Sequence, residues 1–177
     1  MADKSAPKNR TTLYRGEVVN LGLETVTLPN RETLQLEVVR HPGGAAIVAI
    51  DARNRVCLLR QYRHAADGWL WELPAGKIDR PESPQQTAQR ELQEEAGLAA
   101  SDWQLLGSFL STPGFCDERI HLYLARKLTA VAADPHAHEV IEVHWLDYRE
   151  ALEQAHDGQI QDGKTLIGLL LAAPLLI

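Results

Sequence analysis

Three closely spaced glutamates in the middle of the chain are the residues best suited to chemistry. Glu91 directly follows Arg90, and Glu94 and Glu95 come three and four residues after Glu91. On a helix that turns by about 100° per residue, Glu91 and Glu95 project roughly 40° apart and reach the same region of space. Crowded like charges disfavour a helix by roughly 0.2–0.5 kcal/mol per pair unless something neutralises them. A hard divalent cation such as Mg²⁺, bound next to a phosphate, would neutralise these charges. The alternative interpretation is that the glutamates form a solvated helix face without a ligand.

The sequence marks both ends of the helix that carries these glutamates. Ser83 suits the N-cap, Pro84 suits the first helical position, and Gln86 completes a capping box with Ser83. Gly97 fits a left-handed residue that ends the helix. An apolar stripe for packing on a sheet recurs every four residues at Ala88, Leu92 and Ala96.

A strand and a short loop precede this helix. Residues 69–73 (WLWEL) have strand composition, and residues 74–76 (PAG) turn the chain into a loop. Such a loop can direct a backbone carbonyl inward. The carbonyl of Ala75 is therefore the candidate to join the carboxylates around a metal ion.

Residues 76–98, GKIDRPESPQQTAQRELQEEAGL, resemble a Nudix box at every defined position. Seven fixed residues and two aliphatic positions at fixed spacing make this a specific motif. The resemblance implies an α/β (α+β) Nudix fold, in which a mixed β-sheet is sandwiched between helices. It also implies hydrolysis of a nucleoside diphosphate linked to another group, with Mg²⁺, or Mn²⁺ as the alternative, as the cofactor.

Composition is compatible with this interpretation and excludes some partners. The 177 residues suffice for one domain with a substantial core, and the net charge of −6 argues against nonspecific nucleic-acid binding. Cys57 and Cys116 have no metal-ligand spacing, so both are expected to be buried free thiols. Free thiols fit a reducing cytoplasm. The N-terminus is polar, and the apolar C-terminal tail is too short to cross a membrane. A cytoplasmic enzyme without a membrane or nucleic-acid partner is expected.

The pattern of apolar residues and turn formers divides the chain into three parts. We expect a disordered N-terminus (1–12), an N-terminal antiparallel strand module (13–42) and a Nudix hydrolase domain (43–177). The strands of the module are expected at 14–27 and 33–40, and a hairpin is expected from strands 45–50 and 55–61. Further strands are predicted at 103–110, 120–125 and 140–146, and helices at 147–155 and 162–172.

This layout resembles the ADP-ribose pyrophosphatase branch of the family over residues 14–172. The features that carry the resemblance are the N-terminal strands, the run LPAGKID before the box, and Pro113 beyond it, which taken alone would be an ordinary turn. The branch implies hydrolysis of ADP-ribose to AMP and ribose 5-phosphate. It also implies a homodimer in which the N-terminal strands pair between subunits.

The resemblance assigns roles within the box. It makes Glu91 and Glu95 the principal metal ligands, Glu94 an additional ligand, and the Ala75 carbonyl a further one. Arg90 is expected to orient the glutamates, because an arginine four residues before Glu94 favours an ion pair. Glu82 is expected to support the ligands without binding the metal, or else to be a charge in a polar loop.

Candidates outside the box follow from the same resemblance. Glu139, in a histidine-rich loop before a strand, matches a glutamate that acts on the attacking water or a metal, and Glu142 in the strand is its rival. Arg63 matches an arginine that binds the diphosphate, for which a guanidinium fork is suited. Glu118 matches a glutamate that contacts the terminal ribose. The residues that stack on the base cannot be identified from the sequence.

Other functions stay open at this level. The alternatives are hydrolysis of GDP-mannose or another nucleoside diphosphate sugar, hydrolysis of dinucleoside polyphosphates, and a non-catalytic Nudix-fold nucleotide sensor. The intact box and the absence of a basic helix-turn-helix segment argue against a sensor. The sequence does not identify the preferred sugar and base, or the number and identity of the metal ions.

Overall fold

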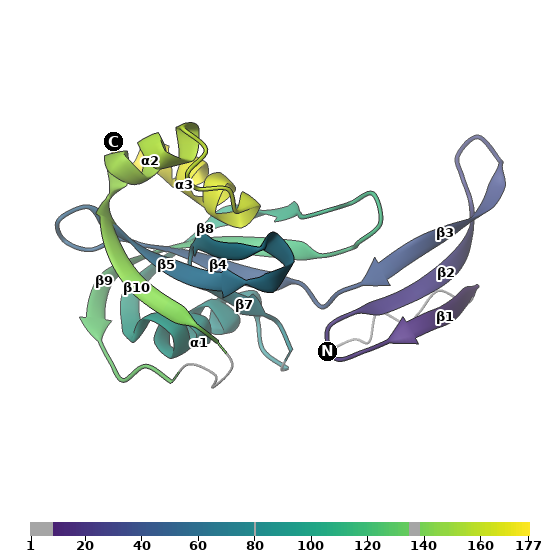
Figure 1. Cartoon of the computed structure of the whole chain (residues 1–177), viewed down its shortest axis with the longest axis horizontal. Helices are drawn as coiled ribbons and strands as arrows, with labels where there is room; N and C mark the ends of the chain where they lie inside the picture. The colour runs from purple at the N-terminus through teal and green to yellow at the C-terminus, as the bar shows by residue number, and fades with distance from the viewer. Residues whose placement is uncertain (1–8, 80, 135–138) are drawn as a thin grey trace.

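The computed structural model describes residues 9–79, 81–134 and 139–177. The first described strands form an antiparallel sheet that stands apart from the rest of the molecule (Figure 1). It comprises β1 (Arg10–Arg15), β2 (Asn20–Thr27) and β3 (Thr33–Arg40), with β2 in the middle.

The N-terminal sheet begins earlier than the sequence predicted. Residues 10–12 were expected to be disordered, but they belong to β1 and pair with β2. Their order has a physical cause: Arg10 Nη1 lies 2.5 Å from Glu24 Oε1, and both side chains are almost completely buried. The prediction of disorder was therefore wrong for residues 10–12, and residues 1–8 lie outside the described part.

The remaining strands form two sheets. One has the order β7-β4-β9-β8, from β7 (Ala75–Lys77), β4 (Gly44–Ala49), β9 (Arg119–Ala130) and β8 (Leu98–Leu110). The β4–β9 pair is parallel and its neighbours are antiparallel, so the sheet is mixed as predicted. The other sheet has the order β10-β5-β6, from β10 (Ile141–Asp147), β5 (Arg55–Arg63) and β6 (Gly68–Glu72), with a short 3₁₀ helix, η1 (His64–Ala66), between β5 and β6.

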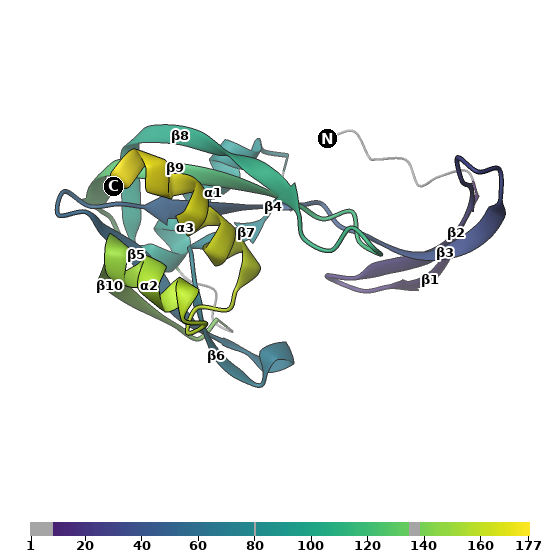
Figure 2. The same cartoon turned by 90° about the horizontal axis from the view of Figure 1, so that it is seen from above.

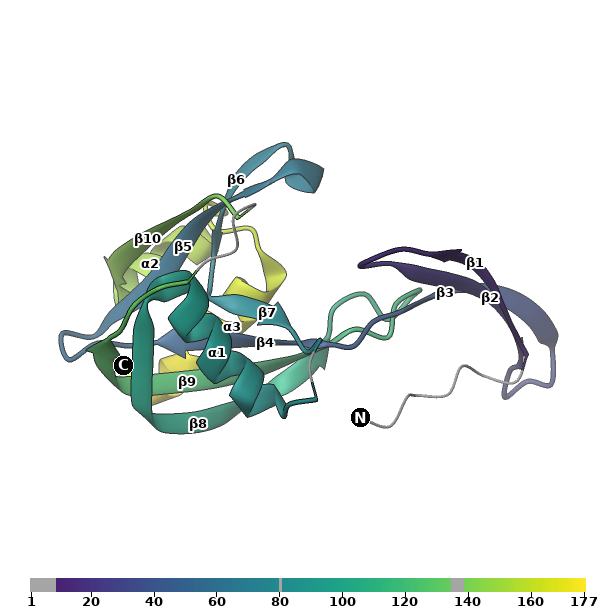
Figure 3. The same cartoon turned by 90° about the horizontal axis from the view of Figure 1, so that it is seen from below.

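Helices cover both faces of the mixed sheet. Helix α3 (Gly163–Leu176) lies over one face beside α2 (Tyr148–His156), and α1 (Pro84–Ala96) lies over the other (Figures 2 and 3). Alternate residues of the fully buried β4 serve the two faces: Val48 packs in the cluster with α2 and α3, whereas Ile47 packs with Leu92 of α1. No helix among the described residues is long and apolar enough to cross a membrane.

The predicted hairpin of residues 45–50 and 55–61 was wrong. Strands β4 and β5 belong to different sheets, and an isolated bridge joins Ile50, the residue after β4, to Val56 of β5. Both edges of β4 are already taken by β7 and β9. Residues 74–76, expected to be a loop, instead contribute Ala75 and Gly76 to β7, which pairs with β4.

Helix α1 has the ends that the sequence predicted. Ser83 Oγ accepts from the backbone N of Gln86, and the Gln86 side chain accepts in return from the backbone N of Ser83 at 2.8 Å. Gly97 has φ 63°, in the left-handed region. The box glutamates therefore sit on a helix whose start and end are fixed by local sequence.

Candidate active site

Part of the predicted site lines one cavity of about 620 Å³. Its lining includes five residues that the sequence singled out from distant parts of the chain: Arg63, Ala75, Glu95, Glu118 and Glu139. They come from β5, β7, α1, the loop before β9 and the segment before β10. The N-terminal sheet also reaches the cavity, through Val18 in the turn between β1 and β2.

Glu95 is the most deeply placed glutamate of the box. Its side chain is nearly buried, and its Oε2 accepts a hydrogen bond of 2.8 Å from the backbone N of Ala75. Burial, together with the charges of Glu91 and Glu139, raises the pKa of Glu95 to about 8, although the bond from Ala75 opposes the shift. A cation beside Glu95 would restore its charged form.

Glu91 packs against the backbone of β7. A Cβ atom added to Gly76 would lie 1.9 Å from Glu91 Oε1, so only glycine leaves room for this carboxylate. Burial raises the pKa of Glu91, although the neighbouring Arg90 opposes the shift. Gly76 of the box thus has a steric role that its spacing alone did not reveal.

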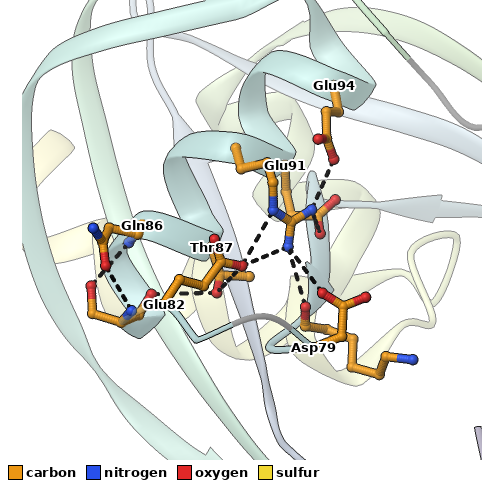
Figure 4. Close-up of polar contacts among 9 residues, drawn as sticks. Asp79, Glu82, Gln86, Thr87, Glu91 and Glu94 are labelled. Atoms are coloured by element: carbon orange, nitrogen blue, oxygen red, sulfur yellow. Dashed lines mark hydrogen bonds and ion pairs between the residues drawn. The ribbon is translucent and has the colours of Figure 1, made fainter. Parts of the chain in front are cut away.

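Arg90 is the centre of the polar contacts around the box, and three of its partners, Glu82, Glu91 and Glu94, are labelled in Figure 4. Its guanidinium donates to Glu91 Oε1 at 2.6 Å and to Glu94 Oε2 at 2.8 Å through Nη1, and to Glu82 Oε1 at 2.8 Å through Nη2. Burial alone would lower the pKa of Arg90, but the bonds to Glu82 and Glu94 outweigh it, and the pKa is raised. The ion pair expected between Arg90 and Glu94 is present.

Glu82 is held on the helix as well as by Arg90. Its Oε1 accepts from Thr87 Oγ1 at 3.0 Å, and Thr87 is completely buried (Figure 4). Arg90 Nη2 also donates to the backbone carbonyl of Lys77 at 3.3 Å. These bonds tie the segment before α1, the helix and β7 into one unit around the carboxylates.

The donor set fits a hard divalent ion. Among the described residues no three acidic, histidine or cysteine side chains enclose an ion as they stand, and Arg90 engages one oxygen each of Glu91 and Glu94. The negative charges of Glu91 and Glu139 nevertheless contribute to the raised pKa of Glu95. A bound cation would relieve this repulsion among the three carboxylates. Oxygen ligands from these carboxylates suit Mg²⁺ or Mn²⁺ better than zinc.

The two candidates for the base differ in their surroundings. Glu139 lines the cavity, and its charge acts on both Glu91 and Glu95. Glu142 projects from β10, is exposed, and lies 3.4 Å from His144 Nε2. These positions favour Glu139 over Glu142 for a role beside the metal ligands. Residues 135–138 of the predicted histidine-rich loop lie outside the described part.

Arg63 lines the cavity but is also held by a partner that the sequence analysis missed. Its Nε and Nη2 donate to the two oxygens of Glu72 at 2.7 and 2.9 Å. Glu72 is buried and also accepts from Lys164 Nζ at 2.5 Å. Burial would raise the pKa of Glu72, but the bonds to Arg63 and Lys164 lower it. The sequence offered only a partial indication of this contact: Glu72 is the one charged residue in the otherwise apolar predicted strand WLWEL.

Glu118 faces the same cavity from the loop before β9. Its Oε1 lies 3.2 Å from His41 Nδ1, and both residues line the cavity. The adjacent Asp117 joins this loop to the N-terminal sheet, because its Oδ2 accepts from Arg40 Nη1 at 3.1 Å and its Oδ1 from the backbone N of His41 at 2.8 Å. His41 and Arg40 carried no signal in the sequence.

Comparisons with known proteins agree with this geometry. The family model of the NUDIX domain matches residues 40–167. A methanol dehydrogenase activator from Bacillus methanolicus is 40% identical over 89% of this chain and 86% of that protein. An ADP-ribose pyrophosphatase from Mycobacterium tuberculosis is 39% identical over 90% of this chain and 78% of that protein, and one from Bacillus subtilis is 33% identical over 86% and 84%.

The fold has a counterpart among solved structures. An ADP compounds hydrolase superposes with a TM-score of 0.82 over 96% of this chain and 92% of that chain, at 19% sequence identity. At that identity the likeness concerns the fold alone. The family match covers well over half of the chain and includes the glutamate helix and every cavity-lining residue except Val18, so the chain belongs to the Nudix family.

Proposed function

We propose that this Nudix hydrolase cleaves the diphosphate linkage of ADP-ribose, giving AMP and ribose 5-phosphate, with Mg²⁺ or Mn²⁺ as cofactor. The observation that carries the proposal is the convergence of Arg63, Glu118 and Glu139 with the box on one cavity. Relatives at 33 and 39% identity that are named ADP-ribose pyrophosphatases support this substrate over other diphosphate sugars.

The box residues would hold the cofactor. Glu91 and Glu95 are the proposed principal ligands, joined by Glu94 and the carbonyl of Ala75, while Arg90 and Glu82 keep the carboxylates in place. When bound, a divalent ion neutralises phosphoryl oxygens and lowers the pKa of bound water. The buried carboxylates would otherwise repel a diphosphate.

The other residues act on water and substrate. Glu139 takes a proton from the attacking water, whose oxygen forms a bond to phosphorus as the bond from phosphorus to the bridging oxygen breaks. The guanidinium of Arg63 binds the diphosphate, and its Nη1, which takes no part in the bonds to Glu72, is suited to phosphate oxygens. Glu118 accepts hydrogen bonds from the hydroxyls of the terminal ribose. Each product then carries one phosphate group.

We further propose a homodimer formed through the N-terminal sheet. The exposed apolar side chains of this sheet and its turns support the proposal, since a free-standing sheet with such a surface requires a cover; they include Leu13, Tyr14, Leu34 and Leu36. The proposed compartment is the cytoplasm, where the free thiols of Cys57 and Cys116 would stay reduced.

A substrate panel tests the proposal. The purified protein is assayed against ADP-ribose, GDP-mannose, other nucleoside diphosphate sugars and dinucleoside polyphosphates, with products identified by chromatography. We expect the highest kcat/KM for ADP-ribose, complete loss of turnover in excess chelator, and recovery with Mg²⁺ or Mn²⁺. A preference for GDP-mannose would change the assigned substrate to that nucleotide sugar. Binding of ADP-ribose without turnover would identify the protein as a nucleotide sensor.

A further inference from the structure

We propose that Lys164 and Glu72 are positioning residues for the substrate-binding arginine, Arg63. The inference rests on the proposed function, because it takes Arg63 as a diphosphate contact. It adds a C-terminal element, the first turn of α3, to a site that the sequence placed in the box and its flanking loops. The three side chains form one continuous ionic contact, Arg63–Glu72–Lys164, in which Arg63 and Lys164 line the cavity.

The direction of the Arg63 side chain depends on Glu72. In the β5–β6 ladder Arg63 lies opposite Gly68, whereas Glu72 lies opposite Leu59. The two positions are four strand residues apart, roughly 13 Å along the strand at about 3.3 Å per residue. Arg63 therefore runs back along the sheet to reach Glu72, on the same face as Gln61, which lines the cavity.

The bidentate contact also selects which part of Arg63 is available. Glu72 engages Nε and Nη2, which leaves Nη1 outside the pair. When one edge of a guanidinium is bonded to a carboxylate, its remaining N–H donors are held in a fixed plane. Such a fixed orientation suits hydrogen bonds to the oxygens of a diphosphate. Glu72 is thus placed to orient Arg63 rather than to touch the substrate.

Lys164 completes the pair from the opposite side. Glu72 is only 2% exposed, and a buried carboxylate is stable only when its oxygens are well satisfied. Lys164 Nζ donates to Glu72 Oε2 at 2.5 Å and to Asp162 Oδ1 at 3.0 Å. Without the lysine, Glu72 would depend on Arg63 alone and would draw its guanidinium further into the wall.

Lys164 is itself rigidly mounted. Asp162 caps α3, accepting from the backbone N of Thr165 at 3.0 Å and from Thr165 Oγ1 at 2.6 Å. Thr165 Oγ1 in turn accepts from the backbone N of Leu73 at 2.8 Å, next to Glu72 in the chain. The start of α3 is therefore joined to the end of β6 at two adjacent residues, and this fixes Lys164 against Glu72.

The test compares Lys164→Met with Arg63→Met, and with the double variant, using the full-length protein. ADP-ribose turnover gives KM and kcat, and calorimetric titration with the non-hydrolysable α,β-methylene analogue of ADP-ribose in the presence of Mg²⁺ gives a binding constant independent of turnover. We expect Lys164→Met to raise KM and Kd about tenfold with kcat within about threefold, because a contact made equally in ground and transition states appears in KM. Lys164→Arg, which keeps a cation beside Glu72, should recover part of the affinity.

The double variant separates positioning from direct contact. If Lys164 acts through Arg63, adding Lys164→Met to Arg63→Met should raise KM by no more than about twofold, since coupled residues are not additive. Equal effects in both backgrounds would show that Lys164 acts on substrate by itself, and unchanged KM and Kd in the single variant would likewise overturn the proposal. Glu72→Gln should behave like Lys164→Met, with thermal unfolding measured to show that the protein is folded.

Lys127→Met is the matched control. Lys127 is a well exposed lysine whose Nζ lies 3.9 Å from Asp102 Oδ2, and it is not among the residues that line the cavity. Its kinetics should equal those of the wild type. If the wild type does not hydrolyse ADP-ribose, the proposed substrate fails, and the same variants are then measured with whichever diphosphate sugar is hydrolysed.

Discussion

Ala75 and Glu95 are twenty residues apart in the chain, yet the backbone N of Ala75 donates to Glu95 Oε2 at 2.8 Å. This bond joins β7 to the last turn of α1, and it fixes the most buried carboxylate of the box against the strand that supplies a proposed carbonyl ligand. Because Gly76 follows directly and accommodates Glu91, two successive residues of β7 set the positions of two glutamates.

Gly76→Ala should lower the activity of the enzyme without unfolding it. The added Cβ would meet Glu91 Oε1 at 1.9 Å, and the flexible end of the Glu91 side chain would move away more readily than the backbone. We expect kcat to fall at least about tenfold, since small displacements of catalytic groups have large effects on rate, with an unchanged circular dichroism spectrum. Gly68→Ala is the control, because its Cβ would have no heavy atom within 4 Å. Equal activity of both variants would contradict the steric role of Gly76.

Glu95→Gln should lower kcat by about 10²–10³-fold, the range for loss of an electrostatic catalytic group. The amide keeps the shape of the side chain but removes the charge that would bind a cation. Steady-state kinetics with saturating Mg²⁺ measure the effect, and Glu153→Gln on the exposed face of α2 provides the control. A Glu95→Gln enzyme with a near-normal rate would refute the assignment of Glu95 as a ligand.

Glu139→Gln should lower kcat far more than it changes KM, because a base acts mainly in the transition state. Glu142→Gln should have a much smaller effect, since Glu142 is exposed on β10 and is not among the residues that line the cavity. Kinetics of both variants decide between the candidates. If Glu142→Gln is the impaired variant, the base lies in the strand and the match at Glu139 was misassigned.

The protein should be a dimer at micromolar concentration. Light scattering should give twice the chain mass of 19.7 kDa. Replacing Leu34 and Leu36 together by serine should shift the protein towards the monomer, because both exposed side chains lie on β3 of the N-terminal sheet. Ser replacement of Leu170 and Leu171, which are exposed on α3, is the matched control. An active wild-type monomer would contradict the proposed dimer.

The sequence by itself determined the features that depend on neighbouring residues. The ends of α1 follow from Ser83, Gln86 and Gly97, because caps are formed by groups a few residues apart. The contact between Arg90 and Glu94 follows from a separation of four residues on a helix. The box motif, with its fixed spacing, was sufficient to predict the family that the comparisons confirm.

Only the tertiary structure decided which strands share a sheet and which distant charges meet. Residues 45–50 and 55–61 looked like a hairpin, but β4 is completely buried between β7 and β9, and pairing across a sheet is not encoded in the short connection. Glu72 and Lys164 are 92 residues apart and bond to each other at the cavity wall. Their contact exists because α3 packs against the end of β6, and long-range packing of this kind leaves no periodic signal in the residues that it brings together.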